Sequence, residues 1–331
     1  MFIEKEDWWV YEGSKTLEDI KETKPKWRDK SKTHDNIDAY QVFSKEVLDA
    51  VNTAIYLRRP LLVTGDPGIG KSSLAKSIAK KLTNRELLSW SITSKSVLKD
   101  ALYSYDALSR LHDIQMKKLY FEQGDIEKSE TFTTDIGQYL KLGALGEAFL
   151  SEESCVVLID EIDKCDIDLP NDLLHIFEEQ EFTIDEVKRT KETNIKIDRQ
   201  AIPNDGLVEC RGDFPIIIMT SNGEKEFPPA FLRRCISVNI SLPDSKEEQI
   251  AKLTNMVVAH FLDGDLEEDE KEEKSKEIVA KLDGLIENFV DLKVDESRIL
   301  ANDQLLNACF LVLNTEMSYE TFKETVLKSL E

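Results

Sequence analysis

The chain has 331 residues, of which 41% are hydrophobic and 33% are charged, as in a folded globular protein. Its formal net charge of −22 would repel a nucleic-acid backbone, which argues against a general DNA- or RNA-coating function. We expect a cytoplasmic protein, because the N-terminus has no basic region before an apolar run and no stretch suits a membrane helix. Five cysteines without a CxxC spacing indicate neither a disulfide scaffold nor a zinc site, and we expect small buried thiols.

Two elements are predicted before the first strand. Residues 1–35 combine aromatic side chains with many charges, which predicts an arm that docks on this chain or on a neighbouring subunit; the aromatic residues are Trp8, Trp9, Tyr11 and Trp27. Apolar residues at helical spacing over 42–59 then predict a helix that ends before Pro60.

A glycine-rich segment follows the apolar stretch 61–64 and precedes a helical pattern over 72–82. It reads Gly65, Asp66, Pro67, Gly68, Ile69, Gly70, Lys71, Ser72 and Ser73. This order fits the phosphate-binding loop GxxxxGK[ST], in which backbone N–H groups wrap phosphate oxygens at a helix N-terminus. Lys71 would neutralise the β- and γ-phosphates and Ser72 would ligate Mg²⁺. A glycine turn that binds nothing is disfavoured by the strand before it and the helix after it.

Short apolar segments recur along the chain, separated by stretches long enough for helices. Strands are predicted at 61–64, 87–92, 155–159, 215–220 and 236–240. This alternation is typical of an α/β fold with a parallel sheet that is covered on both faces.

Polar residues follow two of these strands. Asp160 and Glu161 end the strand 155–159, where Asp160 could hold Mg²⁺ and Glu161 could activate the attacking water. Asn222 follows the strand 215–220 and suits a γ-phosphate sensor, although a turn asparagine before glycine explains it equally well. Arg233 and Arg234 end a short proline-started helix, where they would either stabilise a phosphoryl group in a neighbouring subunit or simply cap the helix.

The C-terminal part after residue 245 has a purely helical pattern. Helices are predicted at 247–261, 273–290 and 303–313, and the acidic stretch 263–273 is predicted to be an exposed loop between them.

Together, these motifs resemble an AAA+ ATPase of the MoxR-like branch. The resemblance covers residues 45–245 well, and it implies an ATP-dependent ring, usually a hexamer, with a P-loop NTPase fold of five parallel strands in the order 5-1-4-3-2 and a C-terminal α-helical lid. By position, Lys71 and Ser72 would be Walker A, Asp160 and Glu161 Walker B, and Asn222 the first sensor. Arg233 or Arg234 would be the arginine finger.

The same resemblance divides the chain into an arm (1–35), a nucleotide-binding domain (36–244) and a lid (245–331). Insertions are expected near 110–150 and 181–212, the second containing a hairpin made of the runs 181–184 and 194–198. Its basic residues are expected to be a solvated hairpin tip in preference to a partner contact; they are Lys188, Arg189, Lys191, Lys196 and Arg199. The second-sensor arginine would be Arg298, which lies a few residues early, so that Asn302 or Asp303 is an alternative occupant.

The function expected from these features is hydrolysis of ATP with Mg²⁺ at subunit interfaces, coupled to remodelling of a protein client. By resemblance, a partner with a von Willebrand A type domain is also expected. The alternatives are a slow nucleotide-gated scaffold in a signalling or defence assembly and, ranked last because of the net charge, a nucleic-acid motor. The residue pattern leaves the choice between ATP and GTP open.

Overall fold

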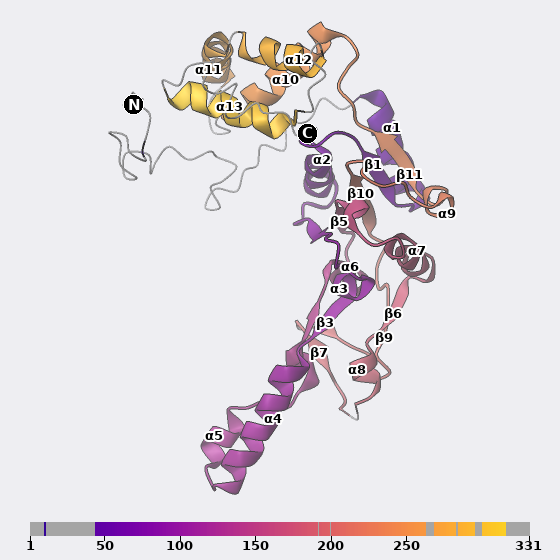
Figure 1. Cartoon of the computed structure of the whole chain (residues 1–331). Coiled ribbons are helices and arrows are strands. Elements are labelled where there is room, and N and C mark those ends of the chain that lie inside the picture. Colours follow the sequence, from indigo (N-terminus) through magenta and orange to yellow (C-terminus); the bar gives the residue numbers. More distant parts are fainter. Residues whose placement is uncertain are drawn as a thin grey trace, which may run out of the picture. The chain divides into compact units, whose positions relative to one another are not determined.

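The computed structural model describes residue 10 and residues 44–190, 192–198, 200–262, 268–282, 284–294 and 300–315 (Figure 1). The aromatic arm predicted at 1–35 and Arg298 lie outside these residues, apart from Val10. Within the described part, no helix combines the length and apolar character needed to cross a membrane. The chain forms two compact units, one of residues 45–64 and 78–239 and one that joins residues 65–77 to the chain from residue 240 onward.

The first unit is built on a five-stranded parallel sheet. Its strands are β1 (Leu61–Thr64), β2 (Leu88–Ser91), β5 (Val156–Asp160), β10 (Ile216–Ser221) and β11 (Ile236–Asn239). They are arranged in the order β11-β1-β10-β5-β2, which is 5-1-4-3-2 when these five strands are numbered along the chain. All neighbouring pairs run parallel, so the carboxyl ends of β1, β10 and β5 lie at one edge of the sheet. The predicted sheet is confirmed.

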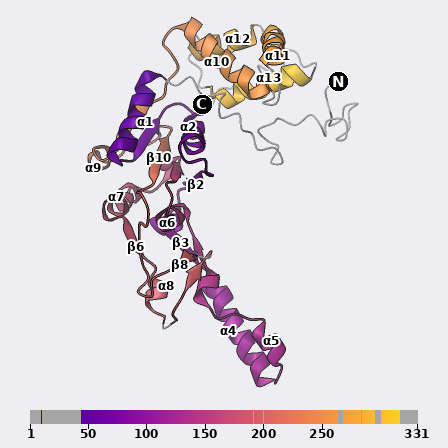
Figure 2. The same ribbon diagram turned by 180° about the vertical axis from the view of Figure 1, so that it is seen from behind.

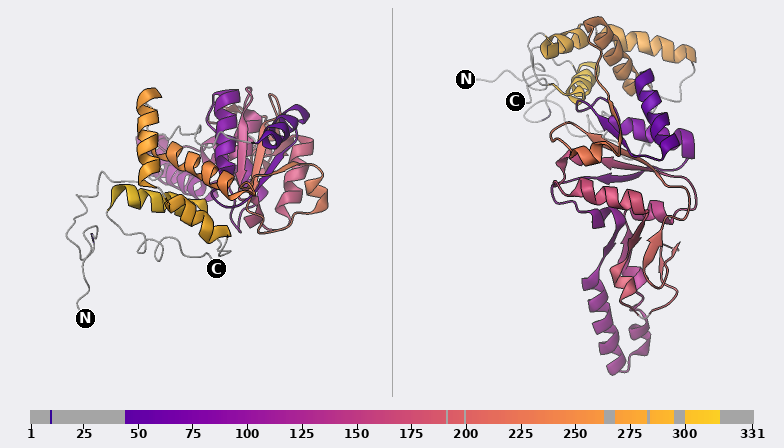
Figure 3. Two further views of the ribbon diagram at one scale, coloured as in Figure 1. Left: turned by 90° about the horizontal axis from the view of Figure 1, so that it is seen from above. Right: turned by 90° about the vertical axis from the view of Figure 1, so that its right-hand side faces the viewer.

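Helices lie on both faces of this sheet (Figure 3), which explains why its central strands are almost wholly apolar. The helices of this layer are α1 (Lys45–Leu57), α6 (Ala144–Leu150), α7 (Leu169–Glu179) and α9 (Pro229–Leu232), with the 3₁₀ turn η5 (Ile162–Lys164) after β5. After β1, the chain continues through α2 (Lys71–Ile78) and the π-helical turn η3 (Ala79–Thr83).

The first predicted insertion is present between β2 and β5. It contains α3 (Leu98–Leu102), β3 (Tyr103–Tyr105), α4 (Ala107–Glu122), α5 (Ile126–Glu130), η4 (Ile136–Tyr139) and β4 (Leu140–Leu142). The strands β3 and β4 form an antiparallel pair, and α4 and α5 project beyond it as a helical hairpin (Figures 1 and 2).

The second insertion differs in detail from the hairpin expected there. β6 (Glu181–Thr183) pairs with β9 (Leu207–Glu209), whereas β7 (Lys196–Ile197) pairs with β8 (Gln200–Ala201), so the runs 181–184 and 194–198 belong to two separate antiparallel pairs. The short helix α8 (Asp185–Lys188) follows β6. The alternation of apolar and polar residues predicted strands here, but it does not determine which strands pair with each other. The basic side chains that are described are exposed, as expected for a solvated tip; they are Lys188, Arg189 and Lys196.

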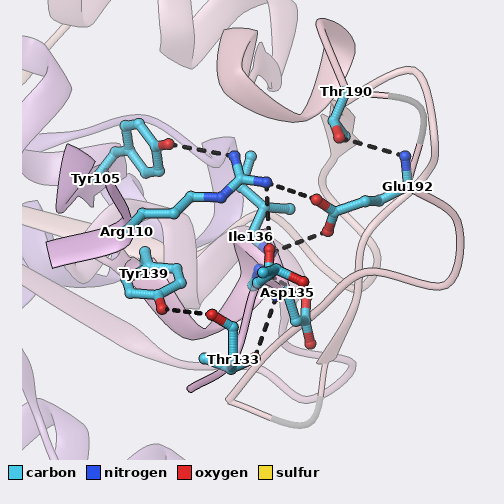
Figure 4. A network of polar contacts seen from close by, with 10 residues as sticks. Tyr105, Arg110, Thr133, Asp135, Ile136, Tyr139, Thr190 and Glu192 are labelled. Carbon is cyan, nitrogen blue, oxygen red and sulfur yellow. Dashed lines mark hydrogen bonds and ion pairs between the residues drawn. The ribbon is translucent and has the colours of Figure 1, made fainter. Parts of the chain in front are cut away.

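A polar network joins the two insertions (Figure 4). The guanidinium of Arg110 in α4 pairs with the carboxylate of Glu192 at 2.5 Å. It also donates a hydrogen bond to the hydroxyl oxygen of Tyr105 at 3.3 Å. The second carboxylate oxygen of Glu192 accepts the backbone N–H of Ile136 at 3.0 Å. Glu192 thus pairs with groups from two elements of the first insertion and joins the second insertion to it.

The helices after residue 245 form a second hydrophobic core. It is built by α10 (Lys246–Phe261), α11 (Glu268–Lys281), α12 (Leu285–Val294) and α13 (Asn302–Asn314). The predictions at 247–261 and 303–313 are confirmed, but the single helix predicted at 273–290 is wrong. Gly284, with φ of +77°, separates α11 from α12.

The loop predicted at 263–273 is wrong for residues 268–273, because α11 begins at Glu268, whereas residues 263–267 lie outside the described part of the chain. Two glutamates of α11 form ion pairs with the lysine four residues later, Glu272 with Lys276 at 2.7 Å and Glu277 with Lys281 at 2.8 Å. Such pairs stabilise an exposed helix that buries little apolar surface.

All five cysteines are free thiols, and four of them are buried as expected, whereas Cys210 is half-buried. Burial raises the pKa of Cys235 and of Cys309 to about 12. These thiols are therefore poor nucleophiles at neutral pH.

Phe149 offers a direct test of the core beneath the sheet. Its side chain is fully buried, with ring centroids 6.0 Å from Phe182 and 6.1 Å from Phe214. We expect Phe149→Ala to lower the free energy of unfolding by about 3–5 kcal/mol. Phe121→Ala, at a 69% exposed position on α4, is the matched control and should change it by less than about 0.5 kcal/mol. Equal effects in urea denaturation would contradict the assigned core.

Candidate active site

The glycine-rich loop starts where β1 ends, at the carboxyl edge of the sheet. Gly65 has φ of +146°, and a Cβ atom at this position would lie 2.2 Å from the carbonyl oxygen of Ile240. Any side chain here would both strain the backbone and collide with a main-chain carbonyl. Gly68 and Gly70 also have positive φ values of +75° and +99°. The backbone geometry therefore requires glycine at the first position of the loop.

Lys71 is the first residue of α2, and its side chain lies within the loop. The residue is 7% exposed, and Nζ donates hydrogen bonds to the carbonyl oxygens of Gly65 at 2.6 Å and of Asp66 at 2.9 Å. Ser72 and Ser73 follow in the first turn of α2, where the helix dipole favours an anion. A buried ammonium and a helix N-terminus thus occur in one short segment, and both attract phosphate. Of the remaining loop residues, Ile69 is buried, whereas Asp66 and Pro67 are exposed.

The hydroxyl of Thr220 links the two acids at the end of β5 to the neighbouring strand. Thr220 Oγ1 donates to Asp160 Oδ1 at 2.5 Å and accepts the backbone N–H of Glu161 at 2.9 Å. Thr220 is 1% exposed and lies on β10, one residue beyond the Met219–Ile159 pair of the sheet register. This hydroxyl therefore fixes both the Asp160 carboxylate and the direction in which the chain leaves the strand. No sequence motif distinguishes Thr220, because a threonine at a strand end is common.

Glu161 has a left-handed backbone conformation, with φ of +60° and ψ of 48°. This conformation is unusual for a residue other than glycine and is characteristic of positions that the surrounding structure constrains. Its carboxylate pairs with Lys164 Nζ at 2.6 Å, and this hydrogen bond raises the pKa of Lys164. Both side chains are about 40% exposed, so the pair contributes only about 0–1 kcal/mol and is easily exchanged for other partners.

Asn222 is held through its main chain by a residue that sequence reasoning did not select. Asp163 Oδ2 accepts the backbone N–H groups of Asn222 at 2.8 Å and of Glu224 at 3.1 Å. Asp163 is 1% exposed and belongs to η5, directly after the two acids of β5. It therefore ties the turn after β10 to the turn after β5. The sequence shows only that a third acid, Asp163, follows Asp160 and Glu161. This spacing does not indicate whether its side chain is buried or exposed.

Arg233 and Arg234 follow α9 and are both exposed, but they differ in their contacts. Arg234 Nε forms an ion pair with Glu178 of α7, and Nη1 reaches the carbonyl of Ala230 at 3.4 Å. Arg233 uses its main-chain carbonyl to accept a hydrogen bond from Arg59 at 3.5 Å, and its guanidinium pairs with no other described residue. Of the two arginines, therefore, only Arg234 has a guanidinium with a partner among the described residues.

Two residues of the C-terminal helices contact the glycine-rich loop within the second compact unit. Lys293 Nζ of α12 pairs with Asp66 at 3.2 Å, and Asn302 Nδ2 at the start of α13 reaches the carbonyl of Gly68 at 3.4 Å. Asn302 is 2% exposed, whereas Asp303 is exposed. Of the two second-sensor candidates that the structure describes, Asn302 is the one whose side chain contacts the loop.

The Thr220 bridge can be tested without any ligand. Thr220→Val leaves the Glu161 N–H and one Asp160 oxygen without this partner, so we expect a loss of about 1–3 kcal/mol in the free energy of unfolding. Thr220→Ser keeps the hydroxyl and should restore most of that loss. Guanidinium denaturation of both variants provides the measurement. A valine variant as stable as the serine variant would show that the hydroxyl is dispensable.

Comparison with known proteins agrees with this geometry. The family model of the AAA domain (dynein-related subfamily) matches residues 60–235, more than half of the chain. No curated protein matches it. Among solved structures, NtrX from Brucella abortus in complex with ADP is 15% identical, with a TM-score of 0.38 over 75% of this chain and 49% of that one. PCH-2 from C. elegans is 18% identical, with a TM-score of 0.36 over 84% and 71%.

The chain spans about half the length of NtrX, so these two similarities say nothing of its substrates or partners. The family match carries more weight, because it runs from the start of β1 to the end of α9 and includes the glycine-rich loop, both acids of β5 and the turn after β10. The chain therefore belongs to the AAA domain family of the dynein-related subfamily, a branch of the AAA+ ATPases.

Proposed function

We propose that this chain is a MoxR-like AAA+ ATPase that hydrolyses ATP at the interfaces of a ring to remodel a protein partner. The observation that supports hydrolysis most is the Asp160–Thr220–Glu161 arrangement, in which one buried hydroxyl fixes two acids at the carboxyl edge of the sheet. A protein that only bound nucleotide would not need the second acid.

The residues present suit a magnesium nucleotide. The hydroxyl of Ser72 and the carboxylate of Asp160 are hard oxygen ligands of the kind that Mg²⁺ prefers. When bound, Mg²⁺ would neutralise charge on the β- and γ-phosphates. Lys71 would bind the same phosphates, because its ammonium already lies inside the loop that is proposed to wrap them.

Glu161 is proposed to take the proton of the attacking water. Its left-handed backbone sets where the side chain leaves β5, and its half-exposed pair with Lys164 is weak enough to be exchanged for another partner. Asn222, fixed by Asp163, is proposed to hold the γ-phosphate or the water beside it.

Substitution of the two charged groups should separate binding from hydrolysis. We expect Glu161→Gln to bind ATP but to lower kcat by about 100-fold or more, because the amide cannot accept the proton. Lys71→Ala should lose ATP binding itself. Glu152→Gln, at an exposed position, is the matched control. Phosphate release and calorimetric titration provide the two readouts, and a normal kcat for Glu161→Gln would remove the base assigned here.

The arginine finger is proposed to be Arg233, since Arg234 already pairs with Glu178. We expect Arg233→Ala to bind ATP normally and to hydrolyse it at least about 100-fold more slowly, whereas Arg234→Ala should mainly lower stability. Mixing Arg233→Ala with Lys71→Ala should restore part of the activity, because some interfaces then join an intact loop to an intact finger. If Arg234→Ala alone abolished hydrolysis, the assignment would pass to Arg234.

The protein client, a partner of the von Willebrand A type and the hexameric ring remain parts of this proposal that rest on family resemblance. A nucleotide-gated scaffold would differ from a remodelling ATPase in one measurable respect. The ATPase rate of a scaffold would rise on assembly of the ring but would not respond to an added protein client.

A further inference from the structure

The guanidinium of Arg234 is held by acceptors from two different helices. Its Nε forms an ion pair with Glu178 near the end of α7, and its Nη1 donates to the carbonyl oxygen of Ala230 in α9 at 3.4 Å. A planar guanidinium that contacts two fixed acceptors keeps little freedom to rotate. The side chain of Arg234 therefore connects the last turn of α7 to α9.

Glu178 lies at a position that is unfavourable for α7 itself. Glu178 and Glu179 both belong to the last turn of this helix, which contains no basic residue. Negative charge at a helix C-terminus is destabilising, because it faces the negative end of the helix dipole. The contact with Arg234 therefore explains an acid at this position, whereas the stability of α7 does not.

The same contact restrains the turn that carries Arg233. Phe231, two residues before it, is fully buried, and the backbone N–H of Arg233 donates to the carbonyl oxygen of Pro229 at 3.2 Å. Arg234, the next residue, is held by Glu178. The main chain of Arg233 is thus fixed on both sides, whereas its side chain is exposed and its guanidinium pairs with no other described residue.

An arginine that completes the site of another subunit must be held in place, because catalysis by a positioned group falls steeply when that group is displaced. A loose turn after α9 would spread the Arg233 guanidinium over many positions. We infer that Glu178 is a positioning residue for the arginine finger: through Arg234, it fixes the turn from which Arg233 reaches the neighbouring site. This inference rests on the proposed function, and it assigns to Glu178 a role in hydrolysis by the adjacent subunit.

ATP hydrolysis by variants of the full chain tests the inference. Glu178→Gln removes the charge and keeps the size of the side chain. We expect it to lower kcat about fivefold, the most that a half-exposed ion pair supplies, and to leave the Kd for ATP within about twofold. Arg234→Ala removes the other half of the pair and should lower kcat by a similar factor, in addition to its effect on stability.

Glu179→Gln is the matched control. It removes an equal charge from the next exposed position in the same turn of α7, and no ion pair of Glu179 with another described residue is present. Its kcat should stay within about twofold of wild type.

Mixed rings show in which subunit Glu178 acts. Lys71→Ala has no working loop but keeps an intact finger, so in an equal mixture with Glu178→Gln half of the intact loops face an intact finger. The rate of this mixture should be about three times the mean of the two separate rates. A defect confined to the variant's own site would give only the mean. The mixture of Arg233→Ala with Lys71→Ala serves as the control that subunits exchange.

With Arg233→Ala slow as expected, two outcomes overturn the inference alone: Glu178→Gln with the same kcat as Glu179→Gln, or a mixture whose rate equals the mean of its components although subunits exchange. A loss in Arg234→Ala as large as that in Arg233→Ala would also overturn it, because Arg234 would then be the finger. If Arg233→Ala kept the wild-type rate, or if the wild-type protein released no phosphate, the proposed function would fail together with this inference.

Discussion

The hydroxyl of Thr220 is the contact on which the candidate active site depends. It is one buried group that donates to Asp160 and accepts from Glu161, so the two acids can be positioned only while β10 and β5 stay in register. Asp163 repeats this arrangement one turn later, by accepting two N–H groups from the turn after β10. In addition to their backbone pairing, the two strands that carry the proposed base and the proposed sensor are therefore connected by the side chains of Thr220 and Asp163. Precise placement of these groups matters more to hydrolysis than their mere presence.

Much of this arrangement was predictable from sequence, and the reasons differ between elements. The central strands β1, β5 and β10 are mostly apolar because both faces of the sheet are covered, and the glycine-rich loop is distinctive because Gly65 has no room for a side chain. Thr220 and Asp163 were not predictable, since their roles depend on pairing between segments about 60 residues apart.

The errors have physical causes as well. Helix α11 was assigned partly to a loop because acidic composition suggests poor packing, whereas its ion pairs at four-residue spacing support an exposed helix. In the second insertion, alternation indicated strands, but strand partners are set by tertiary contacts that a single run does not encode. Position along the chain left Arg298, Asn302 and Asp303 as second-sensor candidates. The contact of the Asn302 side chain with Gly68 depends on tertiary packing that position does not encode.

The central claim is that hydrolysis requires groups from two adjacent subunits. Phosphate release per chain, measured for the wild-type protein over a wide range of protein concentration, tests it most directly. The account predicts that the rate per chain rises with concentration as rings assemble and then levels off. A rate per chain that is independent of concentration, or no phosphate release at any concentration, would contradict it.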